Sequence, residues 1–190
     1  MEKRKEENAR KAKEAAGLLF PGEKWKKWED GIYVAERRKR SGKSNFADEL
    51  RDAQILRDAG GTVYLIPEDT RNYNEPQYDA IVNGYKMELK NMDGNSDASL
   101  IEHFYRSRRQ APNVFFNLEK SPISKGRAIR VVYGARNSPE YEAKNKFPEG
   151  GIIIFRFRGN EDLFYYDVDD ILEKNTGARS ARNGGQAVGF

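Results

Sequence analysis

The sequence contains no cysteine and only one histidine, His103, among its 190 residues. The absence of cysteine excludes disulfide bonds and metal sites built on thiolates. A single histidine cannot supply a site that needs several imidazoles, so a bound metal would have to be held by oxygen. We therefore expect any metal site in this chain to be built from carboxylates.

Long apolar segments are also missing, since 37% of the residues are hydrophobic and 34% are charged. No stretch has the character of a membrane-spanning helix, and charges occupy the place where a secretory signal peptide needs an apolar region. The sequence therefore predicts no membrane segment. Ten Phe, ten Tyr and two Trp still supply enough large side chains for the core of one domain.

Positive charge is modest overall and uneven along the chain. The formal net charge is +4, and Lys and Arg cluster near the N-terminus, at 24–27, at 37–43, at 106–109 and in the C-terminal tail. Such clusters can neutralise nucleic-acid phosphates. Ordinary solvated surface gives the same pattern, so charge alone leaves both interpretations open.

Periodicity and turn signals predict an α/β domain with a mixed central β-sheet flanked by helices. We expect a basic N-terminal helical extension over 1–44, in which Trp25 and Trp28 are buried anchors, a domain over 45–174 and a flexible tail over 175–190. The predicted elements are helices over 1–16, 46–59, 99–110, 124–134 and 169–174, and strands at 62–66, 78–82, 85–90, 114–118, 151–157 and 163–168.

The most informative stretch is a predicted hairpin around Asn83-Gly84. Both residues tolerate the positive φ angles of a type I′ turn, and a two-residue turn fixes the register of the flanking strands. Asp79 then lies opposite Glu88, and Glu88 shares its face with Lys90. The opposite face of the hairpin is apolar and consists of Ala80, Val82, Met87 and Leu89.

Two carboxylates opposed across a ladder destabilise the sheet unless a cation lies between them. Mg²⁺ or Mn²⁺ suits this pair, because both ions prefer oxygen ligands and often use only one or two carboxylates. Lys90 would then orient an attacking water or stabilise charge on a phosphate. The alternative is a solvated strand face whose Lys–Glu contacts contribute little to stability.

Two predicted helices carry further candidates. In the helix over 46–59, Glu49 lies beside the apolar stripe and can reach a site at the sheet edge, with Asp48 and Asp52 as alternatives. In the helix over 99–110, a polar stripe contains Ser99, His103, Arg106 and Gln110.

The polar stripe over 99–110 predicts nucleic-acid contacts. Arg106 can hold a phosphate bidentately with Gln110 assisting, and Arg109 of the same basic cluster is a further contact. His103 titrates near neutrality and is a candidate general acid, although a surface histidine without a catalytic role is the alternative that we favour.

An Asp, a hairpin and a Glu-x-Lys motif, here Asp79 followed by Glu88-Leu-Lys90, resemble the PD-(D/E)XK nuclease superfamily. The run over 45–118 looks like the C-terminal nuclease domain of contact-dependent growth inhibition toxins. One departure is visible: the Pro that often directly precedes the Asp lies at Pro76, with two residues between them.

This resemblance implies a restriction-endonuclease-like core and phosphodiester hydrolysis that depends on Mg²⁺ or Mn²⁺. Asp79 and Glu88 would bind the ion, and the backbone carbonyl of Leu89 would add a ligand. Glu49 would contact the metal directly or through water, and Lys90 would position the attacking hydroxide.

Resemblance to the growth-inhibition toxins further implies RNA, particularly tRNA, as substrate and a cognate immunity protein as partner. It also implies action in the cytoplasm of a target cell after delivery as part of a larger system. Two alternatives remain open at this point: a DNA endonuclease of a phage or mobile element, and a non-catalytic nucleic-acid-binding module.

Overall fold

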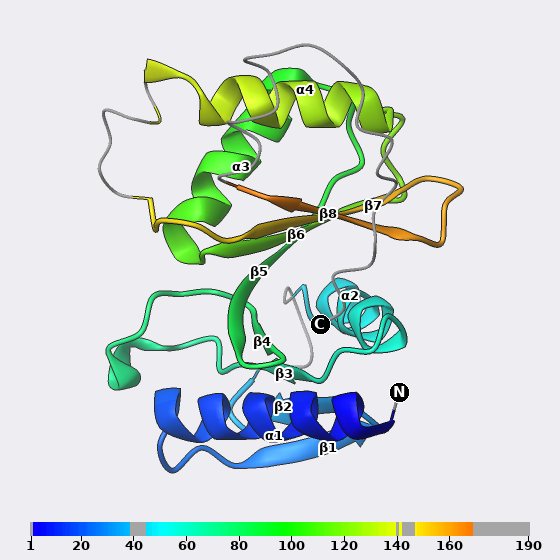
Figure 1. Ribbon diagram of the computed structural model, residues 1–190. Coiled ribbons are helices and arrows are strands. Elements are labelled where there is room, and N and C mark those ends of the chain that lie inside the picture. Colours follow the sequence, from blue (N-terminus) through cyan, green and yellow to red (C-terminus); the bar gives the residue numbers. More distant parts are fainter. Residues whose placement is uncertain (1, 39–44, 140, 142–146, 169–190) are drawn as a thin grey trace. The chain divides into compact units, whose positions relative to one another are not determined.

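The computed structural model describes residues 2–38, 45–139, 141 and 147–168 (Figure 1). These residues fall into two compact units, one that ends at Leu89 and one that begins at Lys90. The helix predicted over 169–174, the tail over 175–190 and the basic residues over 39–44 lie outside the described residues. Within the described part, no helix is both long and apolar enough to cross a membrane.

The first unit contains most of the elements that position the candidate site. In chain order they are α1 (Glu2–Leu19), β1 (Trp25–Glu29), β2 (Ile32–Ala35), α2 (Phe46–Asp58), β3 (Val63–Leu65), the 3-10 helix η1 (Arg71–Tyr73), β4 (Ala80–Val82) and β5 (Tyr85–Asn91), the last of which runs on past Leu89. Strands β2 and β3 pair in parallel, whereas the pairs β1–β2, β3–β4 and β4–β5 are antiparallel.

Strands β1 and β2 lie where the sequence predicted only a helical extension. Strand β2 pairs with β3, so this segment is part of the sheet. Trp25 is half-buried and its ring meets Tyr64 edge-on. Trp28 is 40% exposed, although its ring contacts Phe46. The expectation that both tryptophans are buried anchors is therefore wrong for Trp28, which lies at an irregularity in the β1–β2 register.

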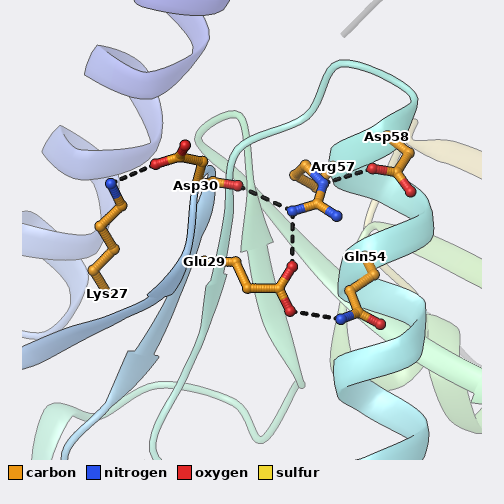
Figure 2. Close-up of polar contacts among 6 residues, drawn as sticks. All are labelled: Lys27, Glu29, Asp30, Gln54, Arg57 and Asp58. Carbon is orange, nitrogen blue, oxygen red and sulfur yellow. Dashed lines mark hydrogen bonds and ion pairs between the residues drawn. The ribbon is translucent and has the colours of Figure 1, made fainter.

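A polar network joins the β1–β2 turn to α2, as Figure 2 shows. The Glu29 carboxylate accepts hydrogen bonds from Gln54 at 2.6 Å and Arg57 at 2.9 Å, which lower the pKa of Glu29. Arg57 also donates to the Asp30 carbonyl at 3.3 Å and to Asp58 at 2.6 Å. These contacts fix the C-terminal half of α2 against the turn, and the first turn of the same helix carries Glu49.

Helix α1 packs on β3 and β4 through a narrow stripe that includes the fully buried Ala12 and Ala16. Gly84 lies beneath this helix, because a Cβ at this position would come within 3.3 Å of the Lys11 carbonyl oxygen. Glycine at the hairpin turn thus serves both the positive φ of 94° and the close approach of α1.

The second unit has three strands and two helices among its described residues. They are α3 (Asp97–Gln110), β6 (Asn113–Leu118), α4 (Lys125–Arg136), β7 (Ile152–Phe157) and β8 (Leu163–Asp167). Strands β6 and β7 are parallel, and β7 and β8 form the predicted antiparallel hairpin. Both helices lie on the same side of these strands in Figure 1 and enclose an aromatic core that includes Phe104, Phe116 and Phe155.

Serine caps begin both helices of the second unit. The Ser96 hydroxyl accepts from the Ser99 amide at 3.3 Å, and Ser124 accepts from the Arg127 amide at 3.4 Å. The second cap confirms the helix predicted from Ser124. With parallel and antiparallel pairs joined to packed helices, the predicted mixed α/β class is confirmed.

Candidate metal and nucleic-acid site

The hairpin around Asn83-Gly84 has the predicted register. Asn83 and Gly84 have φ angles of 51° and 94°, as a type I′ turn requires, and Ala80 pairs with Met87. The β4–β5 ladder ends at this pair, so Asp79 lies directly before β4 rather than in a paired strand position opposite Glu88. Asp79 is nevertheless hydrogen-bonded to Met87 and Leu89, the two neighbours of Glu88 on β5.

Hydrogen bonds hold Asp79 in this position. Its amide donates to the Met87 carbonyl at 3.2 Å, and its carboxylate Oδ2 accepts from the Leu89 amide at 2.9 Å. The Ile66 amide donates to the Asp79 carbonyl at 3.2 Å. The residue before β4 is thus tied to the strands on both sides of it, and one of its carboxylate oxygens accepts from the backbone of β5.

Glu88 is only 1% exposed, and the apolar residues Ala80 and Met87 on the opposite face of the hairpin are fully buried. The alternative of a solvated strand face is therefore wrong for Glu88. Lys86, which shares the face of Glu88, forms an ion pair with Glu75 of the preceding loop at 2.5 Å. A carboxylate enclosed in this way requires compensation for its lost hydration.

Glu49 lies in the first turn of α2 and forms an ion pair with Arg38. Arg38 is 5% exposed and also donates to the carbonyls of Ile66 and Asp79, the latter at 3.4 Å. Sequence reasoning counted Arg38 only as one member of a basic surface cluster. The structure instead places it inside the first unit, beside two of the predicted site residues.

The electrostatics of Glu49 connect it to Asp79. Burial raises the pKa of Glu49, the Arg38 guanidinium lowers it, and the charges of Asp79 and Glu68 raise it again. The two alternative acids of α2 lie elsewhere: Asp48 is paired with Arg51 at 3.3 Å on the surface, and Asp52 is fully buried. Glu49 is therefore an acid of α2 whose charge is coupled to that of Asp79.

In the described part of the chain, no group of three or more histidine or acidic side chains is arranged to hold a metal ion. The candidate centre is thus the Asp79–Glu88 pair, with Glu49 already bonded to an arginine. Two carboxylates are a sufficient protein contribution for Mg²⁺, because this ion usually keeps several waters. Asp79 and Glu88 therefore suit an ion that is held by two carboxylates and several waters, rather than one held by three carboxylates.

Lys90 and the predicted nucleic-acid contacts belong to the second unit. Lys90 is half-buried on β5, two residues after Glu88, and its charge helps to lower the pKa of His103. On α3, Arg106 is exposed and lies 4.0 Å from Glu102, and Gln110 is half-buried. Arg109 is exposed and its guanidinium lies 5.9 Å from the centre of the Phe147 ring.

His103 is half-buried, and its Nδ1 atom has no hydrogen-bond partner among the described residues. Burial lowers the pKa of His103 most, followed by the positive charge of Lys90, with Arg106 also contributing. The imidazole is therefore mostly neutral near pH 7. This weakens the role of general acid and leaves Arg106 as the better cation for a phosphate.

Comparison with known proteins adds one structural likeness. No protein-family model matches the chain, and no curated protein matches its sequence. Among solved structures, the chain is similar to one chain of a CdiA-CT/CdiI toxin and immunity complex from Burkholderia pseudomallei, with a TM-score of 0.49 and 15% identity. The similarity covers 70% of this chain and 97% of that chain. A likeness at this level describes the course of the backbone and assigns no activity.

Proposed function

We propose that this chain is a divalent-metal-dependent endonuclease that cleaves RNA, with tRNA as the favoured substrate. The observation that carries the proposal is Glu88, a carboxylate that is 1% exposed and whose neighbours on β5, Met87 and Leu89, are hydrogen-bonded to Asp79. Like charges that lie close together in a buried place are unfavourable without a cation. Glu88-Leu-Lys90 also matches the Glu-x-Lys motif of the PD-(D/E)XK nucleases.

Each residue has a defined part in this proposal. Asp79 and Glu88, with the carbonyl of Leu89, would hold Mg²⁺ or Mn²⁺, which supplies a Lewis acid and lowers the pKa of bound water. Lys90 lies on the same strand and would orient the attacking hydroxide. On α3, Arg106 would contact phosphate, with Gln110, Arg109 and the neutral His103 as further contacts.

The biological setting is part of the same proposal and rests on the resemblance of the run over 45–118 to growth-inhibition toxin nucleases. It comprises delivery into the cytoplasm of a target cell as part of a larger system, and a cognate immunity protein that blocks the nuclease. DNA as substrate, or binding without cleavage, are the competing outcomes of the test below.

The proposal is tested by incubating the full chain with tRNA, single-stranded DNA and duplex DNA, each with Mg²⁺, with Mn²⁺ and with EDTA. We expect metal-dependent cleavage of tRNA and no cleavage in EDTA. Cleavage of DNA with intact tRNA would contradict the substrate class. Binding of nucleic acid without cleavage in any metal would contradict the enzymatic function.

A second test concerns the metal itself. Asp79→Asn keeps an oxygen that can accept from the Leu89 amide, while it removes the charge that opposes Glu88. We expect its metal-free melting temperature to equal or exceed that of the parent, because repulsion is relieved. In the parent, Mn²⁺ at ~100 times its dissociation constant should add about 2.7 kcal/mol, or a few degrees. In Asp79→Asn this gain should disappear.

Thermal melts of both proteins in EDTA and in Mn²⁺ measure these shifts, and Asp48→Asn serves as the matched control. Asp48 lies on the surface of α2, where it pairs with Arg51. It should therefore keep the full Mn²⁺-dependent gain. An equal gain in Asp79→Asn would mean that the ion binds elsewhere.

A further inference from the structure

Arg38 is a buried arginine of the first unit whose side chain contacts residues of the candidate site. It follows β2 by three residues and is 5% exposed. Its guanidinium donates to the Glu49 carboxylate on α2, to the Ile66 carbonyl after β3 and to the Asp79 carbonyl before β4. One side chain therefore joins three segments that meet around Asp79.

The contact with Asp79 acts on the main chain of a proposed metal ligand. The Asp79 carbonyl accepts from the Ile66 amide at 3.2 Å and from Arg38 at 3.4 Å, and its carboxylate accepts from the Leu89 amide at 2.9 Å. Asp79 is thus held through both its carbonyl and its side chain. Loss of Arg38 would remove one of the two hydrogen bonds to the Asp79 carbonyl without removing a proposed metal ligand.

The contact with Glu49 sets the charge at this side of the site. A guanidinium stays protonated in proteins, so Arg38 places a permanent positive charge against the Glu49 carboxylate. A divalent ion bound directly to Glu49 would have to lie next to this charge or displace it. The enclosed position of Arg38 makes displacement costly, because a buried arginine without its partner is strongly destabilising.

We infer that Arg38 pairs with Glu49 and so keeps it out of the ligand shell of the metal, and that Arg38 also positions Asp79. The centre therefore takes one divalent ion per chain. This inference rests on the proposed function, because it concerns the same Asp79–Glu88 pair. It makes Arg38 a positioning residue rather than a catalytic one. It also narrows the role left open for Glu49, which would not be a direct ligand.

Mn²⁺ binding to the metal-free full chain tests this directly, by calorimetry or by electron paramagnetic resonance of free Mn²⁺. We expect one ion per chain. Glu49→Gln should keep this stoichiometry with affinity within about tenfold. Asp79→Asn should lose clearly more than ~100-fold, beyond the 10–100-fold typical of residues that only support a ligand. Two ions in the parent, no binding, or equal losses in both variants would overturn the inference.

Variants of Arg38 test its positioning role. Arg38→Met alone leaves Glu49 enclosed without its cation and is at risk of unfolding, so the double variant Arg38→Met/Glu49→Gln removes both charges together. We expect this double variant to fold, to bind one Mn²⁺ about 10–100-fold more weakly than Glu49→Gln, and to lose kcat with little change in KM. Equal Mn²⁺ affinity in Glu49→Gln and the double variant would refute the role of Arg38.

The outcomes also separate this inference from the proposed function. A parent that binds one Mn²⁺ at Asp79 but cleaves no nucleic acid would refute the nuclease and leave the one-ion centre standing. A parent that cleaves tRNA but binds two ions, or uses Glu49 as strongly as Asp79, would refute the inference about Arg38 and leave the nuclease standing.

Discussion

Glu88→Gln should reduce metal-dependent cleavage of tRNA by at least about 100-fold and leave the protein folded. Glutamine has nearly the shape of glutamate, so packing around this position, where the side chain is 1% exposed, is preserved. The substitution removes the negative charge that would hold the ion opposite Asp79. A preorganised charged or polar group of this kind typically contributes 10²–10³-fold to rate, by order of magnitude. Initial rates at saturating Mg²⁺ measure the loss.

The matched control is Glu36→Gln, which makes the same change at an exposed position of the first unit. It should cleave at the parental rate. Melting temperatures show whether both variants are folded, and the removal of an enclosed like charge should not lower that of Glu88→Gln in EDTA. Parental cleavage by a folded Glu88→Gln would place the active centre away from the hairpin.

The register of the β4–β5 hairpin was predictable because it depends on a local rule. A two-residue turn at Asn83-Gly84 leaves one favoured register, and alternation then assigns each neighbouring residue to a face. The structure has this register, with Ile81 opposite Lys86. No long-range information was needed for this register, although the paired strand β4 begins one residue after Asp79.

Strands β1 and β2 were missed for the opposite reason. Residues 25–29 read Trp-Lys-Lys-Trp-Glu, which neither alternates as a half-buried strand does nor forms a continuous apolar run. Their strand conformation follows from pairing. β1 pairs with β2, and β2 pairs in parallel with β3, which follows α2 in the sequence. Only the β2–β3 pairing is distant in sequence; β1 and β2 are joined by the short turn at Asp30-Gly31, which is itself a hairpin signal.

The role of Arg38 was hidden in the same way. Its carbonyl partners Ile66 and Asp79 are separated from it by 28 and 41 positions. In the sequence it stands within a run of arginines and lysines, where a solvated side chain is the usual outcome. Only the packing of α2 and the sheet around it turns this arginine into an internal contact.

Arg108 is a second enclosed arginine, and in this case the sequence did contain a signal. It stands in the basic run over 106–109, but Leu100, Phe104 and Arg108 follow one another at steps of four on the buried side of α3. The helical period therefore assigns Arg108 to the core and Arg109 to the surface. Its guanidinium donates to the carbonyls of Pro112, Pro148 (2.5 Å) and Gly150 (2.7 Å) and to the Tyr141 hydroxyl (3.2 Å).

Arg108→Met should destabilise the protein by roughly 3–5 kcal/mol, or about 10 °C in melting temperature. Methionine fills much of the volume but donates no hydrogen bond, so three carbonyls in the second unit lose a charged donor together.

Arg109→Met is the matched control, because the neighbouring side chain is exposed and contacts Phe147 from the surface. Its melting temperature should change little, while its affinity for nucleic acid should fall if Arg109 contacts phosphate. Thermal melts and binding titrations of both variants separate the two roles. Equal melting temperatures would show that the Arg108 contacts add nothing to stability. A larger loss of binding in a folded Arg108→Met than in Arg109→Met would show that Arg108, and not Arg109, contacts the nucleic acid.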